Sequence, residues 1–320
     1  MHLAPVPRDP DLSTKVGSVA LANPVMTASG TAGHGAELGR YVDLGSLGAV
    51  VVKSLSPFPW AGNPAPRVHQ TTGGMINAIG LQGPGVEAWL TDDLPALLAT
   101  GATVVASIWG RSVEDYAAAA DALAGAPPAV VAVEVNLSCP NTEAGRNLFA
   151  HDAAATSEAM AATAGCGRPR WAKLSPNVTD IVPIAAAAQA GGAEAVTLIN
   201  TVMGMAIDPE TRRYRLGNGG GGLSGPAIHP VAVRAVHDVR AALPELPVVG
   251  VGGIAGAADA VELLLAGAQA VQVGTATFAD PRASAKVLAG LEHWCRRHHV
   301  GSIDELIGGA HGPEAARPPT

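Results

Sequence analysis

Two amides and a thiol stand close together where a run of β-branched residues ends. The segment Asn136-Leu137-Ser138-Cys139-Pro140-Asn141 follows the apolar run at residues 131–135. A cysteine thiol can act as nucleophile, metal ligand or general base once its pKa falls below the usual value of about 8.5. An isolated cysteine is more often a structural residue. The flanking asparagines favour a functional site here, because paired amides suit a polar, planar ligand.

Two lysines also stand at the ends of apolar runs. Lys53 ends the run at residues 49–53, and Lys173 lies in the run at residues 171–174. Burying an unpaired ammonium is costly, so an anionic ligand is expected to supply the missing charge. The alternative is that both side chains reach solvent. Two lysines on one face make that alternative the poorer interpretation.

Glycines follow the last two apolar runs. Gly252-Gly253 and Gly274-Thr275 stand where (β/α)8 barrels bind phosphate through backbone N–H groups. Either pair alone could be a tight turn that needs glycine. Together they predict a phosphate site.

Eight short apolar runs alternate with segments of helical length, which predicts a (β/α)8 TIM barrel. Several runs are continuously apolar, as in parallel strands buried on both faces. A doubly wound open sheet is the rival architecture. The expected strands are residues 24–28, 49–53, 103–107, 131–137, 171–174, 195–199, 247–251 and 270–273. The expected helices include residues 113–124, 179–190, 230–243 and 257–266.

Three connections are longer than a barrel needs, and all follow strand ends. They run from residue 54 to about 93, from 138 to about 152, and from 202 to 228, which places long loops at the catalytic face of the barrel. The glycine-rich residues 217–222 lack the Gly-Lys-Ser/Thr of a phosphate loop and predict a flexible lid. No repeat or linker divides the chain, so residues 1–320 are expected to form one domain with a loose tail at residues 312–320.

Composition excludes several classes of protein. Charged residues make up 15% of the 320 residues, 48% are hydrophobic, and the net charge is −7, which argues against a disordered protein and against a nucleic-acid binder. Three cysteines cannot form a disulfide framework. With no export or membrane signal, we expect a cytoplasmic protein. His293, Cys295, His298 and His299 match no standard zinc spacing, so no metal site is predicted.

The sequence between about residues 15 and 285 resembles the class 1 dihydroorotate dehydrogenases, through segments that occur in family order. These are the Asn136–Asn141 segment and Thr27-Ala28-Ser29-Gly30, Val52-Lys53-Ser54, Gly62-Asn63-Pro64-Ala65-Pro66-Arg67, Asn77-Ala78-Ile79-Gly80-Leu81-Gln82, Lys173-Leu174-Ser175-Pro176-Asn177, Ile199-Asn200-Thr201, Gly222-Leu223-Ser224-Gly225-Pro226, Gly252-Gly253-Ile254 and Val273-Gly274-Thr275. The Asn-Ala-Ile-Gly-Leu-Gln form is most similar to the B subtype, which passes electrons to NAD through a partner subunit.

The resemblance implies a barrel that binds flavin mononucleotide (FMN) and oxidises dihydroorotate to orotate in pyrimidine biosynthesis. Cys139 is implied as the base that removes a proton, while the flavin accepts a hydride. The implied substrate-binding residues are Lys53, Asn77, Ala78, Ile79, Gly80, Leu81, Asn136, Asn141, Asn200 and Thr201. The implied flavin-binding residues are Ala28, Ser29, Lys53, Ser54, Ser107, Asn136, Lys173, Ile199, Gly225, Gly252, Gly253, Gly274 and Thr275.

Two positions depart from the family pattern. Ser107 stands where the family usually has an asparagine that contacts the flavin, and Gly83 replaces an asparagine. The alternatives are an FMN barrel oxidoreductase acting on another dihydropyrimidine, and a non-catalytic flavin-binding paralogue. By resemblance, the expected assembly is a homodimer, or a heterotetramer with an FAD and iron–sulfur electron-transfer subunit.

Overall fold

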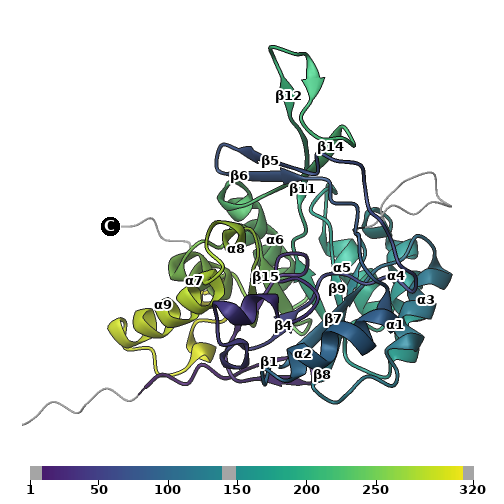
Figure 1. Ribbon diagram of the computed structural model, residues 1–320. Helices are drawn as coiled ribbons and strands as arrows, with labels where there is room; N and C mark the ends of the chain where they lie inside the picture. The colour runs from purple at the N-terminus through teal and green to yellow at the C-terminus, as the bar shows by residue number, and fades with distance from the viewer. Residues whose placement is uncertain (1–8, 139–148, 313–320) are drawn as a thin grey trace, which may run out of the picture.

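The computed structural model describes residues 9–138 and 149–312, and its centre is a closed barrel of eight parallel strands (Figure 1). The strand order is β3-β16-β15-β10-β9-β8-β7-β4, and a bridge between Met26 and Ala49 joins the first strand to the last. The strands are β3 (Val25–Thr27), β4 (Val50–Val51), β7 (Val104–Ile108), β8 (Val130–Asn136), β9 (Arg170–Lys173), β10 (Ala195–Leu198), β15 (Val248–Val251) and β16 (Ala270–Val273).

All eight expected strands are confirmed, and the barrel is preferred over the open sheet because β3 and β4 meet. The continuous apolar runs have the predicted cause: every residue of Val104–Ile108 is buried. Each such strand has one face toward the barrel interior and the other toward the helices.

Helices surround the barrel and cover the outer face of its strands (Figure 1). The α-helices are α1 (Val86–Ala88), α2 (Leu94–Leu98), α3 (Val113–Ala122), α4 (Ala153–Ala162), α5 (Val182–Ala190), α6 (His229–Ala242), α7 (Ala257–Leu265), α8 (Ala276–Ala279) and α9 (Ala283–Arg297). A π-helix, η3 (Trp89–Asp93), joins α1 to α2. The 3-10 helices are η1 (Glu37–Arg40), η2 (Leu44–Ser46), η4 (Phe149–His151), η5 (Thr163–Cys166), η6 (Pro226–Ile228), η7 (Ile303–Glu305) and η8 (Gly309–His311).

The four expected helices correspond to α3, α5, α6 and α7, with ends that follow capping chemistry. Ser112 caps α3 by accepting a hydrogen bond from the Asp115 backbone N–H. Helix α5 begins at Val182, later than expected, because a proline suits the first turn of a helix. None of the helices in the described ranges has the length and apolarity needed to cross a bilayer.

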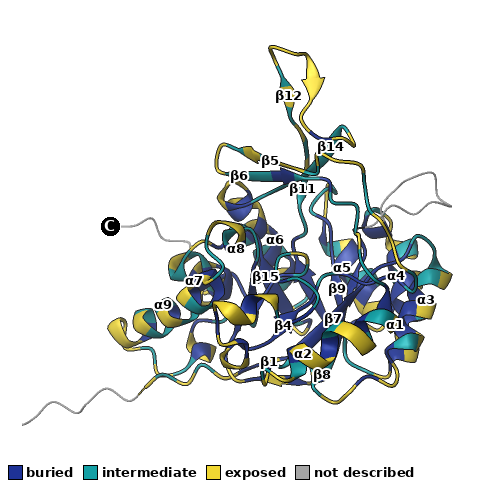
Figure 2. Ribbon diagram, in the orientation of Figure 1, coloured by how far each residue is buried: buried dark blue, intermediate teal, exposed yellow. Residues whose placement is uncertain are grey.

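The hydrophobic core of the barrel has two parts, one on each side of its strands, and most of the strand ribbon is coloured as buried in Figure 2. The larger part lies between the strands and the helices. The smaller part fills the barrel interior and includes Met26, Val105, Trp171 and Val249. A hairpin of β1 (Thr14–Val16) and β2 (Val19–Leu21) adds Val16, Val19 and Leu21 to this interior cluster. The hairpin therefore closes one end of the barrel with apolar side chains.

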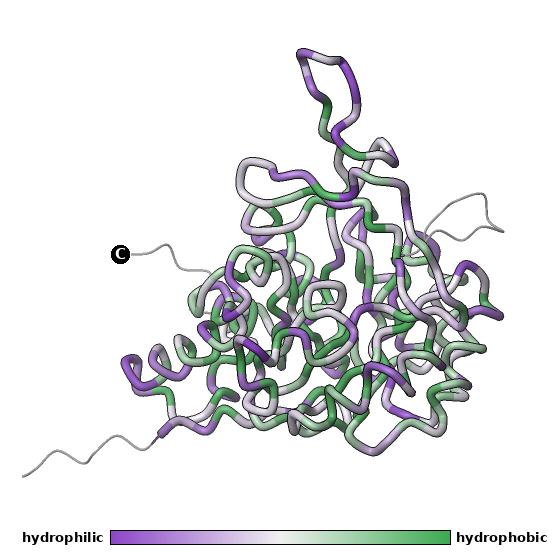
Figure 3. The backbone as a smooth tube through the Cα atoms, viewed as in Figure 1, coloured by the Kyte–Doolittle hydropathy of each residue, from purple (hydrophilic) through white to green (hydrophobic). Residues whose placement is uncertain are grey.

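A second sheet lies over the carboxyl ends of the barrel strands (Figure 1). Its strands, in the order β11-β14-β6-β5, are β5 (Val68–Thr71), β6 (Gly74–Asn77), β11 (Val202–Met205) and β14 (Gly220–Ser224). A ribbon of β12 (Ile207–Asp208) and β13 (Arg213–Tyr214) projects beyond it and is hydrophilic at its tip (Figure 3). The first and third long connections thus lie at the predicted face but contain strands.

Residues 217–222 lie at the cavity, as the predicted lid would, but the last three of them belong to a paired strand and not to a flexible loop. Gly220–Ser224 forms strand β14, which pairs with β11 on one side and β6 on the other. Glycine is needed there for close approach: a Cβ on Gly222 would lie 2.0 Å from the Thr201 Oγ1, and one on Gly221 would lie 2.4 Å from the Asn77 carbonyl oxygen.

Candidate active site

A cavity of about 980 Å³ lies between the carboxyl ends of the barrel strands and the second sheet. Most of the site residues expected from the sequence line it, although they come from segments far apart in the chain. Those that do are Ala28, Ser29, Lys53, Ser54, Asn77, Ala78, Ile79, Gly80, Leu81, Asn136, Lys173, Ile199, Asn200, Thr201, Gly225, Gly252, Gly253, Gly274 and Thr275. A cavity of this size suits a cofactor or a drug-sized ligand.

The cavity floor is polar because the inward-facing positions change in character along each strand. Residues two apart on a strand share a face. In β9, Trp171 belongs to the apolar barrel interior, and Lys173, the next inward residue, lines the cavity. In β8, Ala132 lies in the same interior cluster, followed by Glu134 and then by Asn136 at the cavity. The barrel thus places its polar groups at one end.

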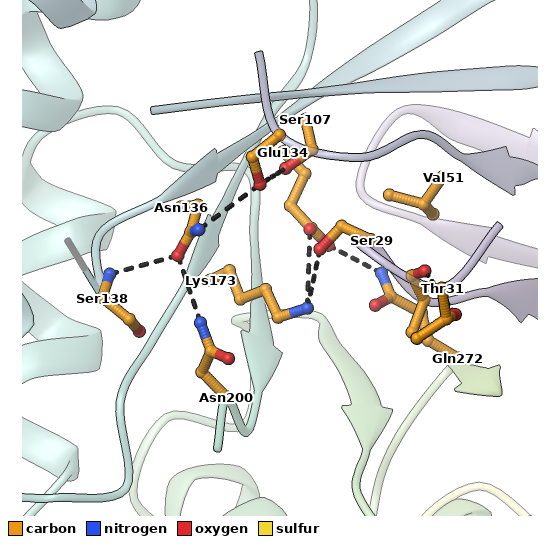
Figure 4. A network of polar contacts seen from close by, with 12 residues as sticks. Ser29, Thr31, Val51, Ser107, Glu134, Asn136, Ser138, Lys173, Asn200 and Gln272 are labelled. Atoms are coloured by element: carbon orange, nitrogen blue, oxygen red, sulfur yellow. Dashed lines mark hydrogen bonds and ion pairs between the residues drawn. The ribbon is translucent and has the colours of Figure 1, made fainter. Parts of the chain in front are cut away.

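Asn136 is the centre of a chain of amides and hydroxyls (Figure 4). Its Oδ1 accepts hydrogen bonds from Asn200 Nδ2 at 3.1 Å and from the Ser138 backbone N–H at 3.2 Å. Its Nδ2 donates to Ser54 Oγ at 3.3 Å. The buried Tyr116 hydroxyl donates to the Asn136 backbone carbonyl at 2.6 Å. These contacts fix the orientation of the amide. A fixed orientation is needed if the amide is to recognise a planar ligand.

Ser107 lies behind this chain, apart from the residues that line the cavity. Its side chain is fully buried, and its Oγ is 2.8 Å from Ser54 Oγ. The serine side chain, which is shorter than the asparagine usual in the family, therefore contacts the hydroxyl of Ser54 and does not reach the cavity. Gly83, the other departure from the family pattern, forms a β-bridge with Trp60 outside the cavity.

A buried charged network lies beside the amide chain (Figure 4). The Lys173 Nζ donates a hydrogen bond to Ser29 Oγ at 2.9 Å and is 3.8 Å from Glu134 Oε1. The other carboxylate oxygen of Glu134 accepts a hydrogen bond from Gln272 Nε2 at 2.7 Å. Lys173 is 5% exposed and Glu134 is 0% exposed. The pair thus lies in a low-dielectric environment, where charges act strongly.

Lys53 contributes a second positive charge to the cavity wall. Its backbone N–H donates to the Gly33 carbonyl, next to His34. Burial lowers the pKa of the His34 imidazole, and the charge of Lys53 lowers it further, against opposing contributions from Asp93 and Glu37. The cavity therefore carries two lysines, which favours an anionic ligand.

The glycines after β15 and β16 form a cradle in the cavity wall. Gly252 and Gly253 have φ values of 144° and 72°, and a Cβ on Gly253 would lie 2.6 Å from the His229 Cβ. Within the described residues, the backbone N–H groups of Gly253 and Gly274 donate to no protein acceptor. Unpaired N–H groups at strand ends are suited to a phosphate.

The sequence analysis missed several cavity residues. Asn177 Nδ2 donates to the Thr201 carbonyl at 3.0 Å, and Asn177 Oδ1 accepts from the Met203 N–H at 2.8 Å. These bonds join the chain after β9 to the start of β11. Asn177 stands four residues after Lys173, so a survey of every polar residue following a strand would have included it. Met203 gave no such signal.

Cys139 and Asn141 lie outside the described residues. Ser138, the described residue that precedes them, lines the cavity.

The fold and the site are those of a (β/α)8-barrel enzyme, with a polar cavity at the carboxyl ends of the strands. A family model described as dihydroorotate dehydrogenase matches residues 11–294, and the chain belongs to this family.

Curated relatives match nearly the whole chain. One from Desulforudis audaxviator is 51% identical over 92% of this chain and 96% of its own length. Others from Alkaliphilus oremlandii and Trichlorobacter lovleyi are each 48% identical, over 93% and 95% of this chain and 98% and 99% of theirs. Each of the three is named as the catalytic subunit of dihydroorotate dehydrogenase B (NAD(+)).

Proposed function

We propose that this protein oxidises dihydroorotate to orotate with bound FMN, as the catalytic subunit of a B-type dihydroorotate dehydrogenase. The observation that carries the proposal is the convergence of Lys53, Lys173 and the Asn136 amide chain on one cavity. An acidic, planar pyrimidine needs both positive charge and paired amides. The family membership and the names of the relatives support the same reaction.

The residues of the cavity fit FMN. The cradle formed by Gly252, Gly253 and Gly274 would offer the phosphate the N–H groups of Gly253 and Gly274, which have no acceptor within the described residues. Lys173, which lines the cavity, would supply a positive charge to balance the negative charge that a flavin gains on reduction. When bound, FMN supplies the acceptor for a hydride.

The substrate side of the cavity is assigned to the amides and to Lys53. Asn77, Asn136 and Asn200 would hold the pyrimidine edges, with Asn141 from the segment outside the described residues, and Lys53 would pair with the carboxylate. Holding the ring in one orientation removes much of the entropic barrier to reaction. Cys139, assigned by resemblance, would take the proton from the substrate carbon as general base.

The first expected result concerns the cofactor. The purified protein should be yellow and release FMN, with no flavin adenine dinucleotide, because the glycines after β15 and β16 are suited to a phosphate group and the chain shows no second nucleotide-binding pattern. Chromatography of the flavin released by denaturation measures this. A colourless protein that cannot be reconstituted with FMN would overturn the proposed cofactor.

The second expected result concerns electron disposal. The relatives are named as catalytic subunits of an NAD(+) enzyme, and the three cysteines of this chain are too few for the four ligands of a typical iron–sulfur cluster. We therefore propose a partner subunit that carries electrons to NAD. The isolated chain should reduce a dye or quinone with dihydroorotate but reduce NAD negligibly.

Adding the electron-transfer subunit should restore NAD reduction. Rapid NAD turnover by the isolated chain would contradict the need for a partner. Efficient reduction of fumarate would instead assign the chain to the A subtype.

A further inference from the structure

We propose that Glu134 is a fixed counter-charge that lowers the reduction potential of the flavin, acting against the ammonium of Lys173. The inference rests on the proposed function, because it requires bound FMN. Glu134 itself does not line the cavity. Glu134 thus tunes the cofactor through its charge and is not a catalytic residue.

The contacts of Glu134 are those of a compensating charge. The carboxylate is fully buried, and its Oε1 accepts no hydrogen bond within the described residues. The partner of that oxygen is the Lys173 ammonium at 3.8 Å, which is an ion pair without a hydrogen bond. Lys173 already has a hydrogen-bond acceptor in Ser29 Oγ at 2.9 Å. The carboxylate therefore adds mainly negative charge, and Ser29 orients the ammonium.

Two hydrogen bonds of this network cross the barrel, one from Gln272 to Glu134 and one from Lys173 to Ser29. In the strand order, β8 and β16 are four positions apart in a ring of eight, and so are β9 and β3. The Gln272-to-Glu134 bond therefore spans the interior between opposite strands, as does the contact of Lys173 with Ser29. Gln272 is itself fully buried, so the carboxylate is held in place from the far wall.

Burying a carboxylate at this depth is costly even when it is paired. A neutral acceptor in the same place would satisfy Lys173 more cheaply. The negative charge has a consequence for the cavity that a neutral group would lack, because reduction adds negative charge to a bound flavin and charges near the ring set its electronics. Lys173 favours reduction of the flavin, and Glu134 opposes it.

The test is the midpoint potential of the bound flavin in Glu134→Gln, measured by equilibration with reference dyes. Glutamine keeps the shape and can still accept the bond from Gln272, but it removes the negative charge. We expect the equilibrium constant for reduction to rise about tenfold, which is about 30 mV upward for a two-electron couple. At an effective dielectric constant of about 20, tenfold is the effect of a unit charge at a separation of about 12 Å, and a shorter separation makes the effect larger.

The matched control is Glu194→Gln, the same substitution at a distant carboxylate. Glu194 precedes β10 at the opposite end of the barrel, where it accepts bonds from Ser18. Its potential should equal that of the wild type. If Glu134 were only structural, Glu134→Gln would change stability and leave the potential unmoved.

An unchanged or lowered potential in flavin-loaded Glu134→Gln would overturn the inference and leave the proposed function intact. A wild-type protein that binds no flavin would overturn both. Should Glu134→Gln not fold, Glu134→Met replaces it, because methionine has a similar length and no charge. The potential of flavin-loaded Glu134→Met must then exceed that of the wild type, and an equal potential would overturn the inference.

Discussion

Replacing Cys139 with alanine should leave flavin bound and slow its reduction by dihydroorotate by about 10²–10⁴-fold, the usual contribution of a general base. Cys139 lies outside the described residues, and its role is proposed from the sequence. Flavin binding should persist because the phosphate cradle and Lys173 belong to other strands. Anaerobic stopped-flow measurement of flavin bleaching gives the rate directly.

Two variants make this experiment specific. Cys139→Ser should retain a little activity at high pH, because a hydroxyl is a far weaker acid than a thiol. Cys166→Ala is the matched control: burial raises the pKa of that thiol, and it lies in η5 behind the barrel wall. The control should reduce its flavin at the wild-type rate. A wild-type rate in Cys139→Ala would show that another group is the base.

The other large effect concerns stability and needs no flavin. Lys173→Met should lower the free energy of unfolding of the flavin-free protein by about 3–5 kcal/mol, because it leaves the Glu134 carboxylate buried without its ion-pair partner. Urea unfolding followed by circular dichroism measures the loss.

Adding Glu134→Gln to Lys173→Met should recover most of that stability. The double variant buries no uncompensated charge, and replacing both partners of a buried pair is often close to neutral. Equal stabilities for the single and double variants would mean that the loss comes from packing of the lysine stem, not from the uncompensated buried charge of Glu134.

The barrel was predictable from the sequence because its strands are buried on both faces. Val50, Val51 and Val52 form a continuous apolar run of the kind that a partly exposed strand does not need. The second sheet was not predictable in this way. Strand β14 contains Gly220, Gly221 and Gly222, whose sequence indicates a loop, and they form a strand only because β6 and β11 approach on both sides. Tertiary pairing there overrides local preference.

The site was predictable where a polar residue ends an apolar run. Lys53, Asn136 and Lys173 have that position, and all line the cavity. The partnership of Glu134 with Gln272 gave no such signal, since the two residues are 138 positions apart and meet only when the barrel closes. A charged residue inside a strand pattern indicates a special environment but does not name its partner.

The hairpin of β1 and β2 has a consequence for the order of events in turnover. Val16, Val19 and Leu21 close the amino end of the barrel, and the cavity formed by the described residues lies at the opposite end, beneath the second sheet. Substrate and product would then enter and leave at the same end of the barrel, one after the other. A small oxidant that entered at the same end would bind only after the product had left. Such a ping-pong mechanism at one site gives parallel lines in a double-reciprocal plot. An oxidant that receives its electrons through the protein does not have to enter the cavity. Oxidation of the flavin can then begin before the product has left.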